Sequence, residues 1–314
     1  MKITNKKPLI ISGSISLLAI ISTLLAFNNL NGGYNGSIES QEWMKNLADT
    51  ADLREISIPG SHDSGALYSI ADVAGKCQDI SIANQLNVGV RFLDIRLKAT
   101  NNGFNVIHGI VDERATFNNV LNDCKNFLSA HPSETILMSV KEEESTSINF
   151  AEKFEDTIKN DNIWITSTNT LPKLGDARGK IILLSRYKNS TLGLNLYDDW
   201  KDGGSSSSHN TFEINLSGDT IFHIQDHYTL ADNEDKWVEV VENLEFANNN
   251  NDRYIINFLS AYLEKGFPPS YSVPVAKYIN PKFLNETSSY TKVGTILFDF
   301  VSQDLAKSVY ERNF

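Results

Sequence analysis

Two histidines in this chain lie where they could carry acid–base catalysis. His62 follows the short apolar run EISIPGS, and His108 ends another such run, FNVIH. Imidazole is the side chain whose unperturbed pKa is nearest to neutrality, so it can both accept and give a proton at physiological pH. If the two rings face each other across a cavity, one can take a proton while the other gives one, and each transfer contributes ~10²–10⁴-fold in rate. The pair therefore predicts general acid–base catalysis.

Charged residues at the ends of other runs supply the partners that such a pair needs. Asp63, Asp94 and Asp299 could each fix the tautomer and orientation of a histidine ring. Arg96 and Lys141 would place positive charge where a transition state becomes anionic, and losing one such donor costs ~10²–10³-fold in rate. Two bases, carboxylates and a guanidinium favour transesterification of a phosphodiester over acyl transfer. The G-x-S-x-G motif of a serine nucleophile does not occur in the chain.

The same residues allow a second interpretation, a divalent metal site. His62, Asp63, Asp94 and His108 all carry side chains that can bind metals. Arg96 follows Asp94 by two residues, however, and a fixed cation disfavours a second cation beside it. We therefore expect a site without metal or cofactor, in which Asp94 and Arg96 form an ion pair.

The candidate residues share a position at or near the end of a short apolar, β-branched or aromatic run. Seven of eight such runs end on a polar side chain that could do chemistry, Arg186 and Asp226 among them. The runs are 55–63, 90–96, 104–109, 135–141, 180–186, 220–226, 254–260 and 294–300. Helical patterns lie between several of them, as over 117–128, where apolar residues recur every three or four positions. This alternation predicts an α/β fold, a parallel (β/α)8 TIM-type barrel with its active site at the carboxyl ends of the strands.

Two segments fit neither the strand nor the helix pattern. Residues 187–213 contain a Gly/Ser tract and are expected to form a long loop, and 265–274 place aromatic residues beside prolines. Long irregular segments in compact domains are usually functional lids or mobile insertions.

Composition narrows the class of protein. The chain has 314 residues, a formal net charge of −11 and 41% hydrophobic residues, which suits one barrel of the usual ~250 residues after a leader. The negative charge argues against nucleic acid as a partner, because binding a phosphate backbone needs a basic surface. It also argues against nonspecific adhesion to anionic lipid.

The N-terminus has the features of an export signal. Lys2, Lys6 and Lys7 precede a mostly apolar run over 8–27, and a Gly/Asn-rich stretch follows. The run is long for a signal peptide and close to the ~20 residues of a membrane span, so a cleaved signal and an uncleaved anchor both stay open. Either places the body outside the cytoplasm, secreted or anchored. We divide the chain into a leader (1–30), a linker (31–40) and a catalytic barrel (41–314).

Cys77 and Cys124 are the two cysteines of the chain. In an exported protein they could form one disulfide, and the alternative is two buried thiols. Neither lies in a C-x-x-C motif, and neither is expected to be catalytic.

Eight segments resemble bacterial phosphatidylinositol-specific phospholipase C in residues, order and spacing. They are SIPGSHDSG (57–65), VRFLDIRLK (90–98), IHG (107–109), HPSETILMSVKEE (131–143), LGDARGKIILLSRY (174–187), IQDHY (224–228), YINPKF (278–283) and VGTILFDF (293–300). The resemblance runs from about residue 41 to the C-terminus and implies a somewhat irregular barrel of the X-domain family. It implies metal-independent cleavage of phosphatidylinositol to diacylglycerol and inositol 1,2-cyclic phosphate, with glycosylphosphatidylinositol anchors as a further candidate substrate.

The resemblance also implies roles for the catalytic residues. His62 matches the general base that takes the proton of the inositol 2-hydroxyl, and Asp299 matches the carboxylate that orients it. His108 matches the general acid that protonates the leaving oxygen, with Asp63 as its partner. Arg96 matches the guanidinium that stabilises the phosphate in place of the calcium ion of other relatives.

Further matches concern the supporting and substrate-binding residues. Asp94 matches a supporting carboxylate. Lys141, Arg186 and Asp226 match residues that hydrogen-bond the inositol hydroxyls, and Tyr228 matches the aromatic residue on which the sugar ring stacks.

The chain departs from the family at the expected membrane contact. The stretch DVAGKCQ (72–78) has no tryptophan, and the rim segment over 265–271 offers Phe267 and Tyr271 instead. We therefore expect a monomer in transient contact with a phosphatidylinositol-containing membrane, with weaker insertion than in tryptophan-bearing relatives. Two alternatives to the main function stay open. One is a metal-dependent glycerophosphodiester or sphingolipid phosphodiesterase on the same barrel, and the other is a non-catalytic inositol-lipid binding module.

Overall fold

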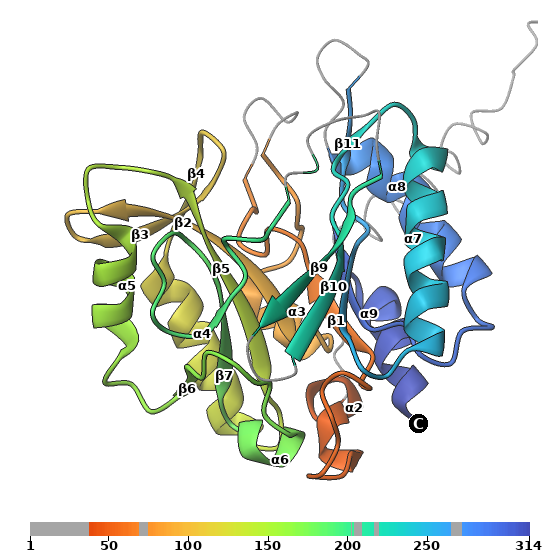
Figure 1. The fold of residues 1–314 in the computed structure, drawn as a ribbon, viewed down its shortest axis with the longest axis horizontal. Coiled ribbons are helices and arrows are strands. Elements are labelled where there is room, and N and C mark those ends of the chain that lie inside the picture. Colours follow the sequence, from red (N-terminus) through yellow and green to blue (C-terminus); the bar gives the residue numbers. More distant parts are fainter. Residues whose placement is uncertain (1–37, 69–74, 202, 204–208, 217–219, 265–271) are drawn as a thin grey trace, which may run out of the picture. The chain divides into compact units, whose positions relative to one another are not determined.

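A curled sheet with helices packed on its outside organises the chain (Figure 1). The computed structural model describes residues 38–68, 75–201, 203, 209–216, 220–264 and 272–314. The strand order is β6-β7-β5-β2-β1-β14-β12-β10-β9. Seven of the eight predicted strands form its parallel part: β1 (Ile58–Ser61), β2 (Phe92–Thr100), β5 (Ile136–Glu144), β7 (Ile181–Arg186), β10 (Thr220–Gln225), β12 (Tyr254–Phe258) and β14 (Thr295–Phe298).

The sheet has irregular edges. The short strands β6 (Trp164–Ile165) and β8 (Leu194–Asn195) pair with β7, and β9 (Thr211–Leu216) pairs antiparallel with β10. Within the described ranges no strand pairing joins β9 to β6 or β8, so the barrel is open on that side. The expected irregular α/β barrel is thus confirmed.

The segment 187–213 was expected to form a long loop. Part of it forms strands instead, and most of its Gly/Ser tract lies outside the described residues.

The run at 104–109 is a strand, but the prediction that it is a parallel barrel strand was wrong. It forms β3 (Gly103–His108), which pairs antiparallel with β2 and with β4 (Val111–Thr116). Two residues separate β2 from β3, whereas a parallel connection needs a dozen or more. Gly103 has a φ of 132°, which a residue with a side chain rarely adopts, and the chain turns back there.

Helices connect the strands and cover the sheet. The expected helix over 117–128 is α4 (Phe117–Ala130), which ends before His131-Pro132 because a residue preceding proline disfavours the helical conformation. Thr116 caps its start, with reciprocal hydrogen bonds to Asn119. The other helices are α2 (Ile38–Gln41), α3 (Ile82–Asn87), α5 (Phe150–Ile158), α6 (Leu174–Ala177), α7 (Asn233–Asn249), α8 (Ser272–Glu286), α9 (Gln303–Tyr310) and the 3-10 turns η1 (Trp43–Asn46) and η2 (Glu311–Asn313).

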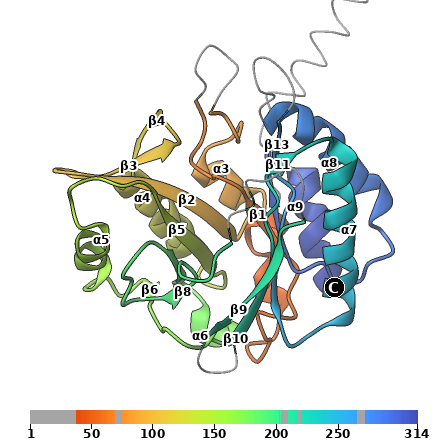
Figure 2. The ribbon, with the colours of Figure 1, turned by 45° about the horizontal axis from the view of Figure 1, so that its top comes forward.

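The core lies between the strands and extends to η1. The central strands are buried on both faces, as every residue of β7, β12 and β14 is, which is typical of parallel sheets covered by helices. Trp43 and Met44 of η1 belong to the same apolar cluster as residues of β2, β5 and β12. Beside η1, the fully buried Arg91 donates to Glu134 over 2.9 Å. Figure 2 shows α7, α8 and α9 together on one side of the sheet.

Several expectations concern residues that the structure does not describe. The leader 1–30, residues 72–74 of the stretch 72–78 and the rim residues 265–271 are among them. Helix α2 occupies the end of the stretch expected to be linker. No described helix has the length and apolar character needed to cross a bilayer.

Of the two alternatives for the cysteines, the structure shows two buried thiols: Cys77 and Cys124 are both free. A small two-stranded sheet, β11 (Thr229–Leu230) with β13 (Tyr262–Leu263), completes the fold.

Candidate active site

Strand register brings the chemistry-bearing residues to one end of the barrel. Ser61, the last residue of β1, pairs with Leu93 of β2 and with Phe298 of β14. His62, Asp94 and Asp299 each come one residue later, so they lie at the same level. On the neighbouring strands Arg96 pairs with Lys141, and Lys141 pairs with Arg186. The three cationic side chains therefore form a row across β2, β5 and β7.

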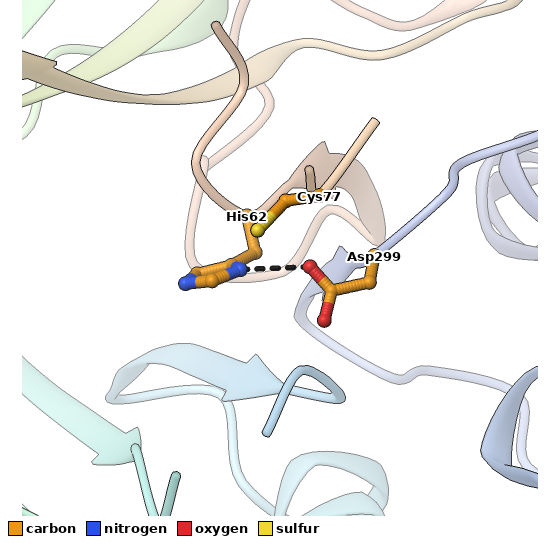
Figure 3. Close-up of side chains that lie close together, drawn as sticks. All are labelled: His62, Cys77 and Asp299. Carbon is orange, nitrogen blue, oxygen red and sulfur yellow. Dashed lines mark hydrogen bonds and ion pairs between the residues drawn. The ribbon is translucent and has the colours of Figure 1, made fainter. Parts of the chain in front are cut away.

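His62 is held at both ring nitrogens. Nδ1 lies 2.8 Å from Oδ1 of Asp299, and Nε2 lies 2.7 Å from Nη2 of Arg96 (Figure 3 shows the Asp299 contact). A guanidinium can only donate, so Nε2 accepts and the ring proton sits on Nδ1, donated to Asp299. The neutral tautomer has its lone pair at Nε2, as a general base requires. Burial and the Arg96 guanidinium oppose a charge on the ring, but Asp299 and Asp94 together raise the pKa of His62 above its usual value.

Arg96 sits among carboxylates at the centre of the site. Its Nη2 lies 3.2 Å from Oδ2 of Asp94, its Nε lies 3.5 Å from Oδ2 of Asp63, and its Nη1 lies 3.6 Å from Oε1 of Glu143. Although burial opposes the charge, these acids raise the pKa of Arg96 well above its ordinary value, so it stays a cation. Burial would raise the pKa of the Asp94 carboxyl, but the Arg96 and Arg186 guanidinium groups hold it well below its usual range. The expected Asp94–Arg96 ion pair is present.

His108 reaches the site from the β3–β4 hairpin rather than from a barrel strand. A Cβ on Gly65 would lie 2.5 Å from Cγ1 of Val106, so the glycine of SHDSG lets β3 approach the β1 turn closely. Nδ1 of His108 donates to the carbonyl oxygen of Gly75 over 2.6 Å. Asp63, its expected partner, lies farther away, with Oδ2 at 3.7 Å from the same nitrogen. Burial raises the pKa of the Asp63 carboxyl, against the pull of Arg96.

The residues expected to bind inositol lie beside this centre. Nη1 of Arg186 lies 3.3 Å from Oδ1 of Asp94, and its guanidinium lies 3.5 Å from the ring centre of Trp200. The indole Nε1 of Trp200 donates to Oδ2 of Asp226 over 3.0 Å. Asp94, Arg186 and Asp226 therefore belong to one connected group of side chains. Tyr228 lies near the rim, with its ring 6.1 Å from that of Tyr262.

Lys141 is paired with an acid that the sequence analysis did not single out. Its Nζ lies 2.6 Å from Oε2 of Glu143, two residues further along β5. Burial and the Arg96 guanidinium lower the pKa of Lys141. Burial would raise the pKa of Glu143, but Arg96 and Lys141 lower it to about 2. The signal was in the sequence, because residues two apart in a strand share a face.

Other residues at the site carried no such signal. Trp200 lies in the segment expected to be a loop, and Gly75 contributes a carbonyl that every residue has. Cys77 Sγ lies 3.8 Å from Nδ1 of His108. Figure 3 shows the same side chain beside His62 and Asp299.

Two groups of potential metal ligands share Cys77. One group is His62, Cys77 and Asp299, and the other is Asp63, Cys77 and His108, with donor atoms within 4.8 Å of one another in each group. One donor atom of each histidine therefore lies within 4.8 Å of the sulfur.

Comparisons with known proteins identify the family of this chain. The family model described as "Phosphatidylinositol-specific phospholipase C, X domain" matches residues 52–187. A protein of Staphylococcus aureus named 1-phosphatidylinositol phosphodiesterase is 31% identical over 313 residues, with 90% of this chain and 91% of the relative covered. A protein of the same name from Listeria monocytogenes is 28% identical, with 92% and 90% covered.

Solved structures resemble the fold over most of its length. A mutant of the phosphatidylinositol-specific phospholipase C from Staphylococcus aureus gives a TM-score of 0.76 at 30% identity, covering 86% of this chain and 96% of that one. The phosphatidylinositol-specific phospholipase C from Listeria monocytogenes gives a TM-score of 0.70 at 25% identity, covering 88% and 99%. The family model, the fold and the sequence identity over nearly the whole chain agree, and this chain belongs to the phosphatidylinositol-specific phospholipase C family.

Proposed function

We propose that this protein is a phospholipase C that cleaves phosphatidylinositol to diacylglycerol and inositol 1,2-cyclic phosphate without a metal ion. The observation that carries the proposal is the contact between Nη2 of Arg96 and the unprotonated Nε2 of His62 at 2.7 Å. The contact places a general base next to a fixed cation. The base can therefore take the proton of a hydroxyl group while the cation binds the phosphodiester beside that hydroxyl. The two named relatives, both 1-phosphatidylinositol phosphodiesterases, support the choice of substrate.

The reaction follows from the positions of the side chains. The substrate phosphate takes over the Arg96 donor that Nε2 of His62 accepts in the free site. The released Nε2 then takes the proton of the inositol 2-hydroxyl, and the resulting imidazolium is stabilised by Asp299. The hydroxyl oxygen attacks phosphorus while Arg96 stabilises the charge on the phosphoryl oxygens. His108, whose side chain is 30% exposed at the rim, gives a proton to the departing diacylglycerol oxygen. In this scheme Asp63 stabilises the charged form of His108 through space, and the carbonyl of Gly75 orients the ring.

Substrate recognition is assigned to the row of cations and the acids beside them. Lys141, Arg186 and Asp226 would hydrogen-bond the inositol hydroxyls, and Tyr228 would offer its ring as a stacking surface. Trp200 holds Arg186 and Asp226 in place, because it contacts both. Glycosylphosphatidylinositol carries the same phosphoinositol unit and is proposed as a further substrate.

The proposal includes transient contact with a lipid surface, export from the cytoplasm and action as a monomer. A solved structure of the Staphylococcus aureus relative bears on modulation of its membrane binding, which supports the first. The net charge of −11 favours apolar over electrostatic contact with anionic lipid. The three lysines and the apolar run at the N-terminus support export.

Phosphorus NMR of the products from a panel of phosphodiester lipids tests the function. We expect turnover of phosphatidylinositol with an inositol 1,2-cyclic phosphate signal, unchanged by EDTA. Activity that disappears in EDTA and returns with calcium or magnesium would refute metal independence. Glycerophosphodiesters or sphingomyelin cleaved in preference would refute the substrate, and binding of phosphatidylinositol without turnover would identify a binding module.

A further inference from the structure

Cys77 occupies the centre of the site and has no role in the proposed reaction. Its side chain is 1% exposed, and its Sγ lies 3.8 Å from Nδ1 of His108. Donor atoms of His62 and Asp299 lie within 4.8 Å of Cys77 Sγ (Figure 3), and so does an oxygen of Asp63. Burial, with the nearby carboxylates Asp299 and Asp63, raises the pKa of the thiol well above its usual value. A neutral thiol is a poor nucleophile, so covalent catalysis does not explain its position.

Asp63 gives an independent indication that a ligand can bind here. Its side chain is fully buried, and neither carboxylate oxygen has a hydrogen-bond partner in the part of the chain that the structure describes. The nearest cationic atoms, Nε of Arg96 at 3.5 Å and Nδ1 of His108 at 3.7 Å, form ion pairs without hydrogen bonds. Buried carboxylates are normally hydrogen-bonded or coordinate a metal. Asp63 therefore has two oxygens available to a bound cation.

We propose that Asp63, Cys77 and His108 form a binding site for Zn²⁺ or a similar thiophilic divalent cation, and that the bound ion inhibits the enzyme. Thiolate, imidazole and carboxylate are the three ligand types of zinc, whereas Ca²⁺ and Mg²⁺ prefer sites made of oxygen alone. The site goes beyond the proposed metal-free reaction, which needs no ion.

Two ligand separations lie within about 0.4 Å of those in tetrahedral zinc coordination. Usual zinc–ligand lengths and a tetrahedral angle place a sulfur and a nitrogen ligand about 3.6 Å apart, and a nitrogen and an oxygen ligand about 3.3 Å apart. The corresponding separations are 3.8 Å between Cys77 Sγ and His108 Nδ1, and 3.7 Å between His108 Nδ1 and Asp63 Oδ2. The donor atoms of Cys77 and Asp63 lie within 4.8 Å of one another, so side-chain shifts would complete the three-ligand face and leave the fourth position to water.

Binding changes the protonation of the ligands. The thiol of Cys77 releases its proton to solvent, and His108 moves its proton from Nδ1 to Nε2 and gives up its bond to Gly75. Arg96, 3.5 Å from Asp63, opposes a second cation, so the ion should bind reversibly rather than reside permanently. With Nδ1 on the metal, His108 cannot hold the protonated form that the leaving group needs, so turnover stops.

The alternative group, His62 with Cys77 and Asp299, is less suited to a metal. Both nitrogens of His62 are already engaged, Nδ1 with Asp299 at 2.8 Å and Nε2 with Arg96 at 2.7 Å. A metal there would have to displace one of these bonds and approach the guanidinium more directly.

Cobalt binding to the full chain tests the site without relying on activity. Co²⁺ substitutes for Zn²⁺ and gives a near-ultraviolet charge-transfer band when a thiolate binds it. We expect this band in the wild type and its displacement by zinc chloride. We expect it also in Cys124→Ala, which removes the buried thiol of α4, and in His62→Ala. Cys77→Ala and Cys77→Ser should lose the band, and His108→Ala should weaken it. Far-ultraviolet circular dichroism confirms the fold of each variant.

Zinc inhibition is the second measurement, with each variant normalised to its own activity in EDTA. We expect Cys77→Ala to need at least about tenfold more zinc for half-inhibition, because even partners outside the coordination shell contribute about 10–100-fold to metal affinity. Cys124→Ala should behave as the wild type. A cobalt band that survives in Cys77→Ala, or that depends on His62 rather than His108, would overturn the proposal. Absence of any band in wild type would overturn it also, and would leave the proposed phospholipase activity untouched.

Discussion

Arg96 donates a hydrogen bond to Nε2 of His62 over 2.7 Å, which fixes the ring in the tautomer of a base before any substrate arrives. On the other side of the ring, Asp299 accepts the Nδ1 proton over 2.8 Å. The guanidinium disfavours the imidazolium and the carboxylate favours it, so the two neighbours act in opposite directions on the same group. The pKa of His62 is raised because Asp299 and Asp94 together outweigh burial and the guanidinium.

The pH dependence of turnover should therefore respond to Asp299. In Asp299→Asn the charge that raises the pKa of His62 is gone, so the ring loses its proton at lower pH. We expect the acidic limb of the kcat/KM profile to move to lower pH, with a lower plateau because the ring is less well oriented. Asp304→Asn, at an exposed carboxylate of α9, is the control and should leave the profile in place. A limb that moves to higher pH would contradict the assignment.

His108 should be dispensable when the leaving group needs no proton. We expect His108→Ala to lose ~10²–10⁴-fold in kcat on phosphatidylinositol. Most of that loss should disappear on an inositol phosphodiester with a p-nitrophenol leaving group. His62→Ala should be equally impaired on both substrates, because the attacking hydroxyl still needs a base. Equal losses for His108→Ala on both substrates would exclude a general acid role.

Arg96 should not be replaceable by lysine. An ammonium group keeps the charge but cannot donate two parallel hydrogen bonds to a phosphate. We expect Arg96→Lys to lower kcat by ~10²–10³-fold, the cost of one lost transition-state donor. Arg253→Lys, at a surface pair with Glu213, is the control and should keep full activity in the same steady-state assay. Near-normal turnover of Arg96→Lys would show that charge alone suffices.

Glu143 should contribute stability that is lost in acid. Its pKa in the fold is about 2, against an ordinary value near 4.5. A carboxyl with a depressed pKa stabilises the fold above its unfolded pKa, and this contribution fades as pH falls toward the folded value. Glu143→Gln should therefore be less stable than wild type at pH 6, and the gap should narrow between about pH 4.5 and 2. Urea unfolding of both proteins at a series of pH values measures this difference in unfolding free energy. A difference that stays constant from pH 6 to pH 2 would contradict the role of the Glu143 ion pairs in stability.

The buried pair Arg91–Glu134 should matter for folding rather than catalysis. Both side chains are fully buried, so removing one partner leaves an uncompensated charge. We expect Arg91→Met to lower the free energy of unfolding by about 3–5 kcal/mol, and the double variant Arg91→Met/Glu134→Leu to recover much of it. Lys45→Met, which breaks the exposed pair with Glu42, should leave the free energy of unfolding in urea close to that of the wild type.

Much of the fold was predictable because parallel strands leave a strong signal. Seven apolar runs became β1, β2, β5, β7, β10, β12 and β14, since strands buried on both faces are apolar throughout. The run containing His108 is similarly apolar, so composition alone predicted a parallel strand there. Its antiparallel pairing follows from the two-residue connection to β2, which is too short for a parallel crossover. Strand β9 was missed because it lies beside a Gly/Ser tract that dominates the composition of its segment.

The sequence alone determined which side chains could do the chemistry, because residue type and position at a strand end are both local properties. His62, Arg96, Asp94 and Asp299 were recognisable in this way, and strand register then placed them together. Only the tertiary structure decided the other partners: Gly75 for His108, Trp200 between Arg186 and Asp226, and Cys77 near both histidines. These contacts join residues from separate segments, and the distances between such segments are set by how the whole barrel packs.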